Sequence, residues 1–322
     1  MIYGKLYAFA ACAFFLAAGA ASAAEVPAPK PAGRFYYAHK TFLNYETVGK
    51  GPVPVVFLHG FGASLRVWDG VISHLPQVRF TVYLLDLKGA GLSSIPRDGR
   101  YSMRDNADLV NKFIKAKKLS GYTLVGHSFG GAVALFSAID SLSDPALKPR
   151  KLVLIDPAAY PAKLPGYIKA MRSPVLRNLI NSLTTEKLGV SLIMEKVVYD
   201  KRIITDALIR KYTVLMDREN YNYALWKTAD QMVPKKTEQF TSRYKELRYP
   251  ALIIWGKEDG VLPLADGELL ARDLPDARLK VLEKCGHDAP EEFPRETARL
   301  IAAFDAAADN IDIHPPEKAP AE

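Results

Sequence analysis

Residues 126–130 of the 322-residue chain form a Gly-x-Ser-x-Gly pattern, in which Ser128 is a candidate nucleophile. A short apolar run precedes the pattern, and a segment that fits a helix follows it. Gly126 and Gly130 suit a sharp turn between a strand and a helix, because the two elements approach so closely that Cβ atoms would clash. The turn would expose Ser128 at the helix N-terminus, where the helix dipole favours a developing negative charge. The sequence therefore predicts that Ser128 is a nucleophile.

A serine hydroxyl needs a general base to take its proton, and the base needs a carboxylate to orient it. Both residue types occur late in the chain, each just beyond a short apolar run. Asp259 follows the run at residues 251–255, and His287 follows the run at residues 279–282. We predict that His287 is the base for Ser128 and that Asp259 holds the imidazolium.

Two other carboxylates compete with Asp259 for the role of the acid. Asp156 also ends an apolar run, and it remains the alternative acid. Glu258 is adjacent to Asp259 in the sequence, but we expect its side chain to point elsewhere. The pattern favours Asp259 and leaves Asp156 open.

A tetrahedral intermediate also needs hydrogen-bond donors for its oxyanion, and removing one such donor costs roughly 3–4 kcal/mol. One donor is expected to be the backbone N–H of Phe129, the residue after the nucleophile. The second is expected to be the N–H of Phe61, in the His-Gly-Phe-Gly loop at residues 59–62. We expect His59 to order this loop by hydrogen bonding and His127 to pack beside the serine turn.

No pattern in the sequence points to a metal or a cofactor. The stretch at residues 85–93 contains two glycines but lacks the G-x-G-x-x-G spacing, and no helix follows it immediately. We interpret this stretch as a structural turn rather than a phosphate-binding loop. The sequence has no Cys/His cluster of the kind that binds a metal. The predicted chemistry needs neither a metal nor a cofactor.

The elements that would position these residues are short β-branched runs alternating with helical segments. Strands alternating with helices indicate a mostly parallel sheet that is covered on both faces. Ligands of such sheets bind at the carboxyl ends of the strands, which is where the candidate residues lie. The predicted strands cover residues 53–58, 82–86, 123–125, 152–156, 251–255 and 279–282, and one predicted helix covers residues 105–118.

Residues 157–249 interrupt this alternation. They contain no convincing core strand, but apolar residues recur in them at helical spacing. We predict a helical subdomain inserted after one strand, lying as a cap over the carboxyl edge of the sheet.

With these motifs the sequence resembles the α/β-hydrolase superfamily, in the capped branch that includes lipases, esterases, C–C bond hydrolases, epoxide hydrolases and haloalkane dehalogenases. The resemblance extends over residues 35–304, and the chain order Ser, acid, His fits it. It implies an α/β fold with a mostly parallel eight-stranded sheet, helices on both faces and an inserted helical cap. One position departs from the family pattern, since Lys88 stands where related chains commonly have proline. The residues that carry the resemblance are His59 to Gly62, Asp86 to Ser93, Gly126 to Gly131, Asp259 and His287.

The nucleophile narrows the implied activity. Epoxide hydrolases and dehalogenases carry aspartate where this chain has Ser128, so the serine disfavours both activities. The resemblance implies a serine hydrolase that cleaves carboxylic esters, with apolar or lipid-like acyl groups favoured, through an acyl-enzyme. C–C bond hydrolysis and acyl transfer on the same triad remain alternatives. A non-catalytic binding role is a minor alternative, against which the complete set of candidate catalytic residues argues.

The two ends of the chain are not expected to belong to the fold. An apolar stretch at residues 8–21 followed by Ala-Ser-Ala is typical of a secretory signal, which predicts export to the periplasm or medium. An uncleaved membrane anchor is the alternative. The predicted divisions are a signal peptide (1–23), a proline-rich spacer (24–34), the first part of the core (35–156), the cap (157–249), the second part of the core (250–305) and a disordered tail (306–322).

The net charge of +8 lies in the predicted cap. Residues 157–249 hold 17 Lys and Arg against 9 Asp and Glu, whereas the remainder of the chain after the signal is close to neutral. The chain shows no nucleic-acid-binding motif, so we predict no nucleic-acid partner. Exposed helix faces would account for the basic residues, and contact with an anionic lipid surface is the sharper hypothesis. The other predicted partner is a small-molecule ester, and the sequence does not indicate an oligomeric state.

Overall fold

The computed structural model describes residues 33–38, 40–161, 166–173, 175, 184–233 and 238–307. The predicted signal peptide, nearly all of the predicted spacer and residues 308–322 of the predicted tail lie outside this range. The two boundaries that can be compared differ slightly from the prediction. The first strand begins at Gly33, inside the predicted spacer, and the last helix ends at Ala306, inside the predicted tail.

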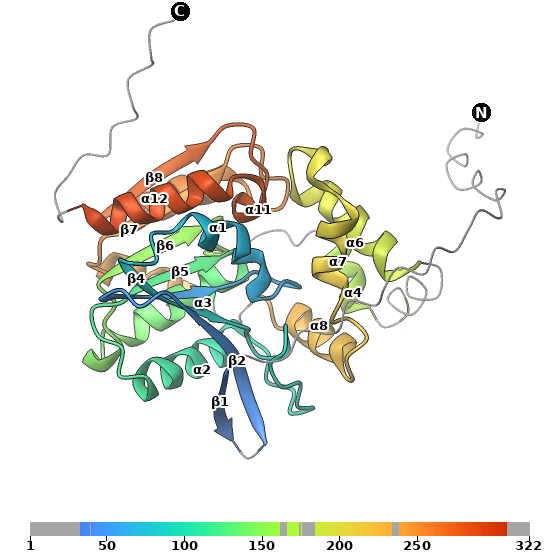
Figure 1. Ribbon diagram of the computed structural model, residues 1–322, viewed down its shortest axis with the longest axis horizontal. Helices are drawn as coiled ribbons and strands as arrows, with labels where there is room; N and C mark the ends of the chain where they lie inside the picture. The colour runs from blue at the N-terminus through green and yellow to red at the C-terminus, as the bar shows by residue number, and fades with distance from the viewer. Residues whose placement is uncertain are drawn as a thin grey trace, which may run out of the picture.

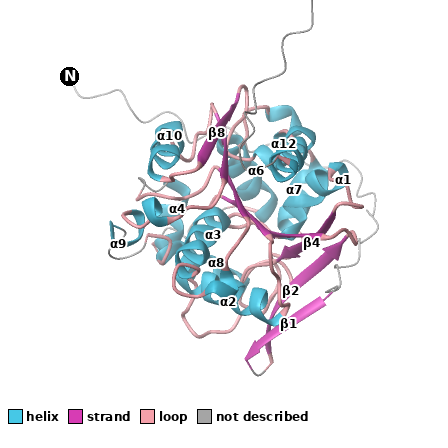
Figure 2. Cartoon of the chain, turned by 90° about the vertical axis from the view of Figure 1, so that its left-hand side faces the viewer, coloured by secondary structure: helices cyan, strands magenta, loops and turns pink. Residues whose placement is uncertain are grey.

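Eight strands of the described chain form one sheet in the order β1-β2-β4-β3-β5-β6-β7-β8. β2 pairs antiparallel with β1 and with β4, and the remaining neighbours are parallel. The mostly parallel eight-stranded sheet is therefore confirmed, and Figure 2 shows its strong twist. The strands are β1 (Gly33–Ala38), β2 (Thr41–Val48), β3 (Val53–Leu58), β4 (Phe80–Leu85), β5 (Thr123–His127), β6 (Lys151–Ile155), β7 (Ala251–Gly256) and β8 (Ala277–Leu282).

Strands β1 and β2 form an antiparallel hairpin that the sequence analysis did not identify. In β1 the side chains alternate between partly buried and exposed positions. Such alternation is typical of an antiparallel strand with one wet face, whereas the predicted strands were recognised as the continuous apolar runs of a buried parallel sheet.

Helices cover both faces of the sheet. Alternate residues of each central strand contact opposite layers, so that Val55 and Phe57 of β3 belong to one apolar cluster and Val56 and Leu58 to the other. Helices α1 (Asp69–His74) and α12 (Pro294–Ala306) contribute to the first cluster. Helices α2 (Met103–Ala116), α3 (Phe129–Asp140) and α10 (Leu264–Asp273) contribute to the second.

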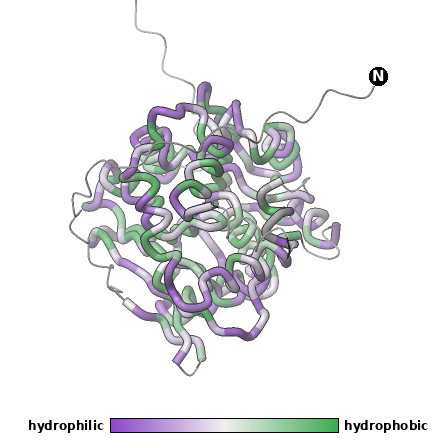
Figure 3. The backbone as a smooth tube through the Cα atoms, turned by 90° about the vertical axis from the view of Figure 1, so that its right-hand side faces the viewer, coloured by the Kyte–Doolittle hydropathy of each residue, from purple (hydrophilic) through white to green (hydrophobic). Residues whose placement is uncertain are grey.

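The described chain between β6 and β7 consists of helices joined by loops, and we call residues 157–249 the cap. Figure 1 shows the cap helices gathered on one side of the sheet, and Figure 3, viewed from that side, shows hydrophobic and hydrophilic stretches alternating along them. Amphipathic helices of this kind bury one face and expose the other. The cap helices are α4 (Gly166–Arg172), α6 (Glu186–Val197), α7 (Asp206–Thr213), α8 (Tyr221–Asp230) and α9 (Glu238–Thr241).

Within the described ranges, the helices are too short or too polar to cross a lipid bilayer.

Candidate active site

Ser128 lies in the turn between β5 and α3. Its backbone has φ 52° and ψ −115°, a conformation that a residue with a side chain adopts only under constraint. A Cβ on Gly126 would lie 2.4 Å from the carbonyl oxygen of Gly130, and a Cβ on Gly130 would lie 2.4 Å from that of Leu58. Both glycines are therefore required by the close approach of α3 to β5 and β3. The crowded turn leaves the Ser128 side chain partly exposed at the start of α3.

The structure brings the three predicted catalytic side chains into one hydrogen-bonded chain. Nε2 of His287 lies 2.8 Å from Oγ of Ser128, and Nδ1 of His287 lies 2.7 Å from Oδ2 of Asp259. The other oxygen of Asp259 accepts hydrogen bonds from the backbone N–H groups of Val261 and Leu262. The Asp259 side chain is fully buried and that of His287 nearly so. This geometry allows His287 to take the serine proton while Asp259 fixes the ring.

Asp156 lies close to the same group but makes different contacts. Its Oδ1 accepts the backbone N–H of Gly256 at 2.8 Å, and its side chain makes no hydrogen bond to His287. Burial, with the nearby charge of Asp259, holds the pKa of Asp156 well above its usual range. Asp259, and not Asp156, is therefore the carboxyl group that is hydrogen-bonded to His287. Glu258 accepts the N–H of Cys285 and points away from His287, as expected.

In the described part of the chain, potential metal-ligand atoms gather at Asp156, Asp259 and His287, within 4.8 Å of one another. His287 uses both ring nitrogens in hydrogen bonds to Ser128 and Asp259. A metal would have to break at least one of these bonds, so the donor set fits a proton relay better than a metal centre.

The loop after β3 packs against the serine turn. Gly60 packs against His127 and Ser128, since a Cβ there would lie 3.3 Å from the Ser128 Cβ. His59 is buried, its Nδ1–H donates to the Gly60 carbonyl at 2.8 Å, and its Nε2 accepts the N–H of Leu87 at 3.0 Å. His59 therefore orders the loop that carries Phe61. Phe61 and Phe129 both line the cavity at Ser128.

The glycine turn after β4 is structural, as the sequence indicated. The buried carboxylate of Asp86 accepts hydrogen bonds from the N–H groups of Leu65 and Leu92, which ties this turn to the loop after β3. A Cβ on Gly91 would overlap that carboxylate. Lys88, the position that departs from the family pattern, is buried and paired with Asp98 at 2.6 Å.

His127, the residue before the nucleophile, also holds the catalytic loop. Its Nε2 lies 2.8 Å from the carbonyl oxygen of His287, and since a carbonyl only accepts, this nitrogen carries the proton. Burial lowers the pKa of His127, which keeps its ring neutral. The sequence analysis expected packing here and did not foresee this bond, because the partner lies 160 positions further along the chain.

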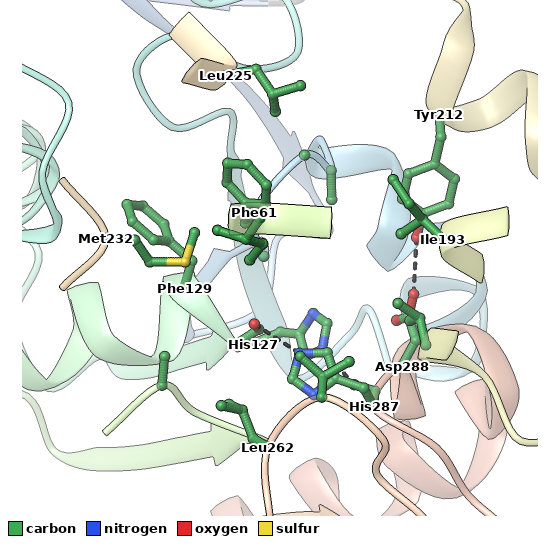
Figure 4. A pocket seen from close by; sticks show the side chains of 18 of the residues that line it. Phe61, His127, Phe129, Ile193, Tyr212, Leu225, Met232, Leu262, His287 and Asp288 are labelled. Carbon is green, nitrogen blue, oxygen red and sulfur yellow. Dashed lines mark hydrogen bonds between the residues drawn. The ribbon is translucent and has the colours of Figure 1, made fainter. Parts of the chain in front are cut away.

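Ser128 opens into a cavity of about 460 Å³ that lies between the core and the cap. In Figure 4 Phe129 and Met232 lie on one side of His287, and Asp288 and Tyr212 lie on the other. Most of the lining side chains are apolar, which suits a site for an apolar ligand. The apolar lining includes Phe61, Phe129, Phe136, Ile193, Leu225, Met232, Phe240 and Leu262.

The cap is hydrogen-bonded directly to the loop that carries His287. The backbone N–H of His287 donates to the carbonyl of Val197, at the end of α6, at 2.6 Å. Glu292 accepts the N–H groups of Gly286 and of cap residue Tyr199, both at 2.7 Å. The position of the catalytic histidine is therefore coupled to the position of α6.

Comparison with known proteins agrees with this architecture. The family model described as the alpha/beta hydrolase fold matches residues 53–294. The chain belongs to the α/β-hydrolase family. Its relatives include an uncharacterized hydrolase, YugF, of Bacillus subtilis, which is 28% identical over 84% of this chain and 93% of its own length. The human monoacylglycerol lipase ABHD6 is 26% identical over 80% of this chain and 77% of its own length. Among solved structures, an alpha/beta hydrolase fold protein from Burkholderia ambifaria matches with a TM-score of 0.74 and 22% identity, covering 85% of this chain and 98% of that one.

The chain is thus an α/β-hydrolase with esterase and lipase relatives, and it is an enzyme. Sequence reasoning found the residues that carry short motifs and missed two polar residues of this hydrolase's cavity. Asp288 directly follows His287, and Tyr212 comes from α7. In the sequence Tyr212 is one of several residues at helical spacing in the predicted cap, and nothing there shows that it faces a carboxylate 76 positions away.

Proposed function

We propose that this α/β-hydrolase cleaves carboxylic esters with apolar acyl groups through a serine acyl-enzyme. The observation that carries the proposal is the hydrogen-bonded chain of Ser128, His287 and Asp259 at the floor of an apolar cavity. The named activities of relatives, among them monoacylglycerol lipases, support ester chemistry.

The proposed mechanism uses the geometry directly. Oγ of Ser128 attacks the ester carbonyl as its proton passes to Nε2 of His287, and the N–H groups of Phe61 and Phe129 bind the oxyanion. His287 then gives the proton to the leaving alkoxide, and the acyl group remains on Ser128. A water molecule, deprotonated by the same histidine, hydrolyses the acyl-enzyme and regenerates the serine.

A chain-length series of p-nitrophenyl esters tests this proposal. Burial of each further CH₂ group in the apolar cavity contributes about 0.8 kcal/mol, which raises kcat/KM roughly fourfold per carbon until the cavity is full. Ser128→Ala is expected to abolish the activity. A wild-type enzyme that leaves every ester intact, but cleaves a vinylogous diketone, would favour the C–C hydrolase alternative instead.

We further propose that the protein is exported and that it rests with its cap against an anionic lipid surface. Leu188 and Leu192 lie one turn apart on α6 and are 48% and 50% exposed, and the exposed Lys187 and Lys196 flank them. The exposed Glu186 and Glu195 of α6 balance these two lysines, so the attraction to anionic lipid comes from the net charge of +8 of the whole cap. An exposed apolar stripe on a basic cap suits a membrane interface, where each nearby basic residue contributes on the order of 1 kcal/mol.

A further inference from the structure

The cavity at Ser128 has a mostly apolar lining with a polar corner beside the catalytic histidine. Among the described lining residues the charged groups outside the triad are the carboxylates of Asp288 and Glu186, and no lysine or arginine lines the cavity. The corner next to His287 is formed by Asp288 of the core and Tyr212 of the cap, as Figure 4 shows.

Asp288 is buried and only half-satisfied. Its residue is 3% exposed, and its Oδ2 accepts the hydroxyl proton of Tyr212 at 3.0 Å. Its Oδ1 has no hydrogen-bond partner among the described residues. A buried carboxylate oxygen without a partner is unfavourable, so a site with this feature favours a ligand that brings a donor.

Tyr212 acts as a donor toward Asp288. Burial, followed by the nearby carboxylates of Asp288 and Glu291, holds the pKa of Tyr212 well above its usual range, so the phenol stays protonated. Because its proton points to Asp288, the phenol oxygen remains able to accept a hydrogen bond. The corner therefore holds two acceptors, one on each residue, of which Oδ1 of Asp288 is covered in this structure and has to be uncovered by the alcohol that binds it.

The corner lies beside the histidine that has to protonate the leaving alcohol. Nε2 of His287 must reach the alkoxide oxygen to protonate it, so the alcohol has to sit beside this ring. Asp288 is the next residue after His287, and it lies on the opposite side of the ring from Phe129 and Met232 (Figure 4). An acyl chain along the apolar wall leaves the alcohol facing Asp288 and Tyr212.

We propose that Asp288 and Tyr212 form a subsite for a neutral, hydroxyl-bearing alcohol, so that the enzyme prefers esters of a polyol such as glycerol over esters of a plain alkanol. Oδ1 of Asp288 accepts one free hydroxyl of the alcohol, and the phenol oxygen of Tyr212 accepts another. An alcohol that carries a phosphate finds no cationic side chain in the described lining and meets the Asp288 carboxylate instead. This inference rests on the proposed ester hydrolysis.

The test compares two octanoate esters that share the acyl group and the three-carbon alcohol skeleton, 1-mono-octanoylglycerol and propyl octanoate. The measured quantity is the ratio of their kcat/KM values in wild type, Asp288→Ala and Tyr212→Phe. The wild type is expected to prefer the glycerol ester, and the ratio is expected to fall about tenfold in Asp288→Ala and about threefold in Tyr212→Phe. A role confined to folding would lower both esters equally and leave the ratio unchanged.

Tyr199→Phe is the matched control, because Tyr199 is an exposed cap tyrosine outside the cavity lining, and its ratio should equal that of wild type. If Asp288→Ala does not fold, Tyr212→Phe still decides. An unchanged ratio in the folded variants would overturn the subsite and leave the proposed ester hydrolysis intact. A preference of wild type for octanoylcholine over the glycerol ester would have the same consequence. If wild type cleaves neither octanoate, the proposed function fails and the subsite fails with it.

Discussion

The loops that hold Ser128, His287 and Asp259 and the cap that lies over them are built in opposite ways. In the loops, glycines admit close backbone contacts, and buried polar side chains such as Asp86 and His59 join one loop to the next by hydrogen bonds. In the cap, helices pack by apolar faces, and six of the nine large apolar side chains that are exposed in the described chain belong to it. The three residues of the hydrogen-bonded chain therefore all lie in the core, whereas core and cap share the lining of the cavity.

The largest expected effect tests which carboxylate serves the core. Asp259→Asn should lower kcat about 10⁴-fold, because an amide at this position favours the wrong tautomer of His287. Asp156→Asn should cost less than tenfold, since Asp156 bonds to Gly256 and not to the ring. Steady-state kinetics on one p-nitrophenyl ester measures both variants, and the reverse order of effects would make Asp156 the acid.

A smaller effect is expected where the cap is joined to the core. The Arg218 guanidinium donates to the carbonyl oxygens of Gly91 and Ser93 in the glycine turn. Arg218→Ala should lower the free energy of unfolding by about 1–2 kcal/mol, which corresponds to a fall in Tm of roughly 2–4 °C. Arg210→Ala, at an exposed position of α7, is the control in thermal unfolding. Equal melting of the two variants would mean that Arg218 does not anchor the cap.

A still smaller effect depends on pH. Burial lowers the pKa of His59, so below about pH 6.5 the unfolded chain binds a proton that the folded chain does not. The folded state therefore loses stability as the pH falls below about 6.5. The raised pKa of Asp156 has the opposite effect on stability as the pH falls. The contribution of His59 is therefore isolated by comparing wild type with His59→Gln. The variant should show a smaller difference in Tm between pH 7.5 and 5.5 than wild type.

An exposed histidine provides the control for this pH effect. His74→Gln, on the surface of α1, should retain the wild-type difference in Tm between the two pH values. If His59→Gln also shows the wild-type difference in Tm between pH 7.5 and 5.5, neutral His59 does not contribute to the acid sensitivity.

The smallest expected effect concerns the outer face of the cap. Lys196→Glu should weaken binding to anionic vesicles at least fivefold, because each basic residue near the surface contributes about 1 kcal/mol to binding. Lys112→Glu, an equal charge change on an exposed position of α2, should weaken it less. Vesicle co-sedimentation measures both, and equal binding of wild type to anionic and neutral vesicles would contradict the lipid proposal.

Features encoded by neighbouring residues could be predicted from the sequence. The Gly-x-Ser-x-Gly turn follows from the crowding of adjacent elements. The apolar runs identified six of the strands, and the clearest runs belong to central strands such as β5 and β6, which are buried on both faces. The hairpin of β1 and β2 was missed because its alternating pattern is weaker. The contacts of Asp288 with Tyr212 and of His127 with His287 join distant parts of the chain, and only the fold brings them together.

The central claim is that Ser128 is the nucleophile of an ester-cleaving triad, and covalent labelling tests it most directly. Purified wild type should react with a fluorophosphonate probe at one residue, which peptide mass spectrometry should identify as Ser128. Ser128→Ala should remain unlabelled, and His287→Ala should react far more slowly because the general base is lost. A well-folded wild type that stays unlabelled, or one labelled at a residue other than Ser128, would contradict the account.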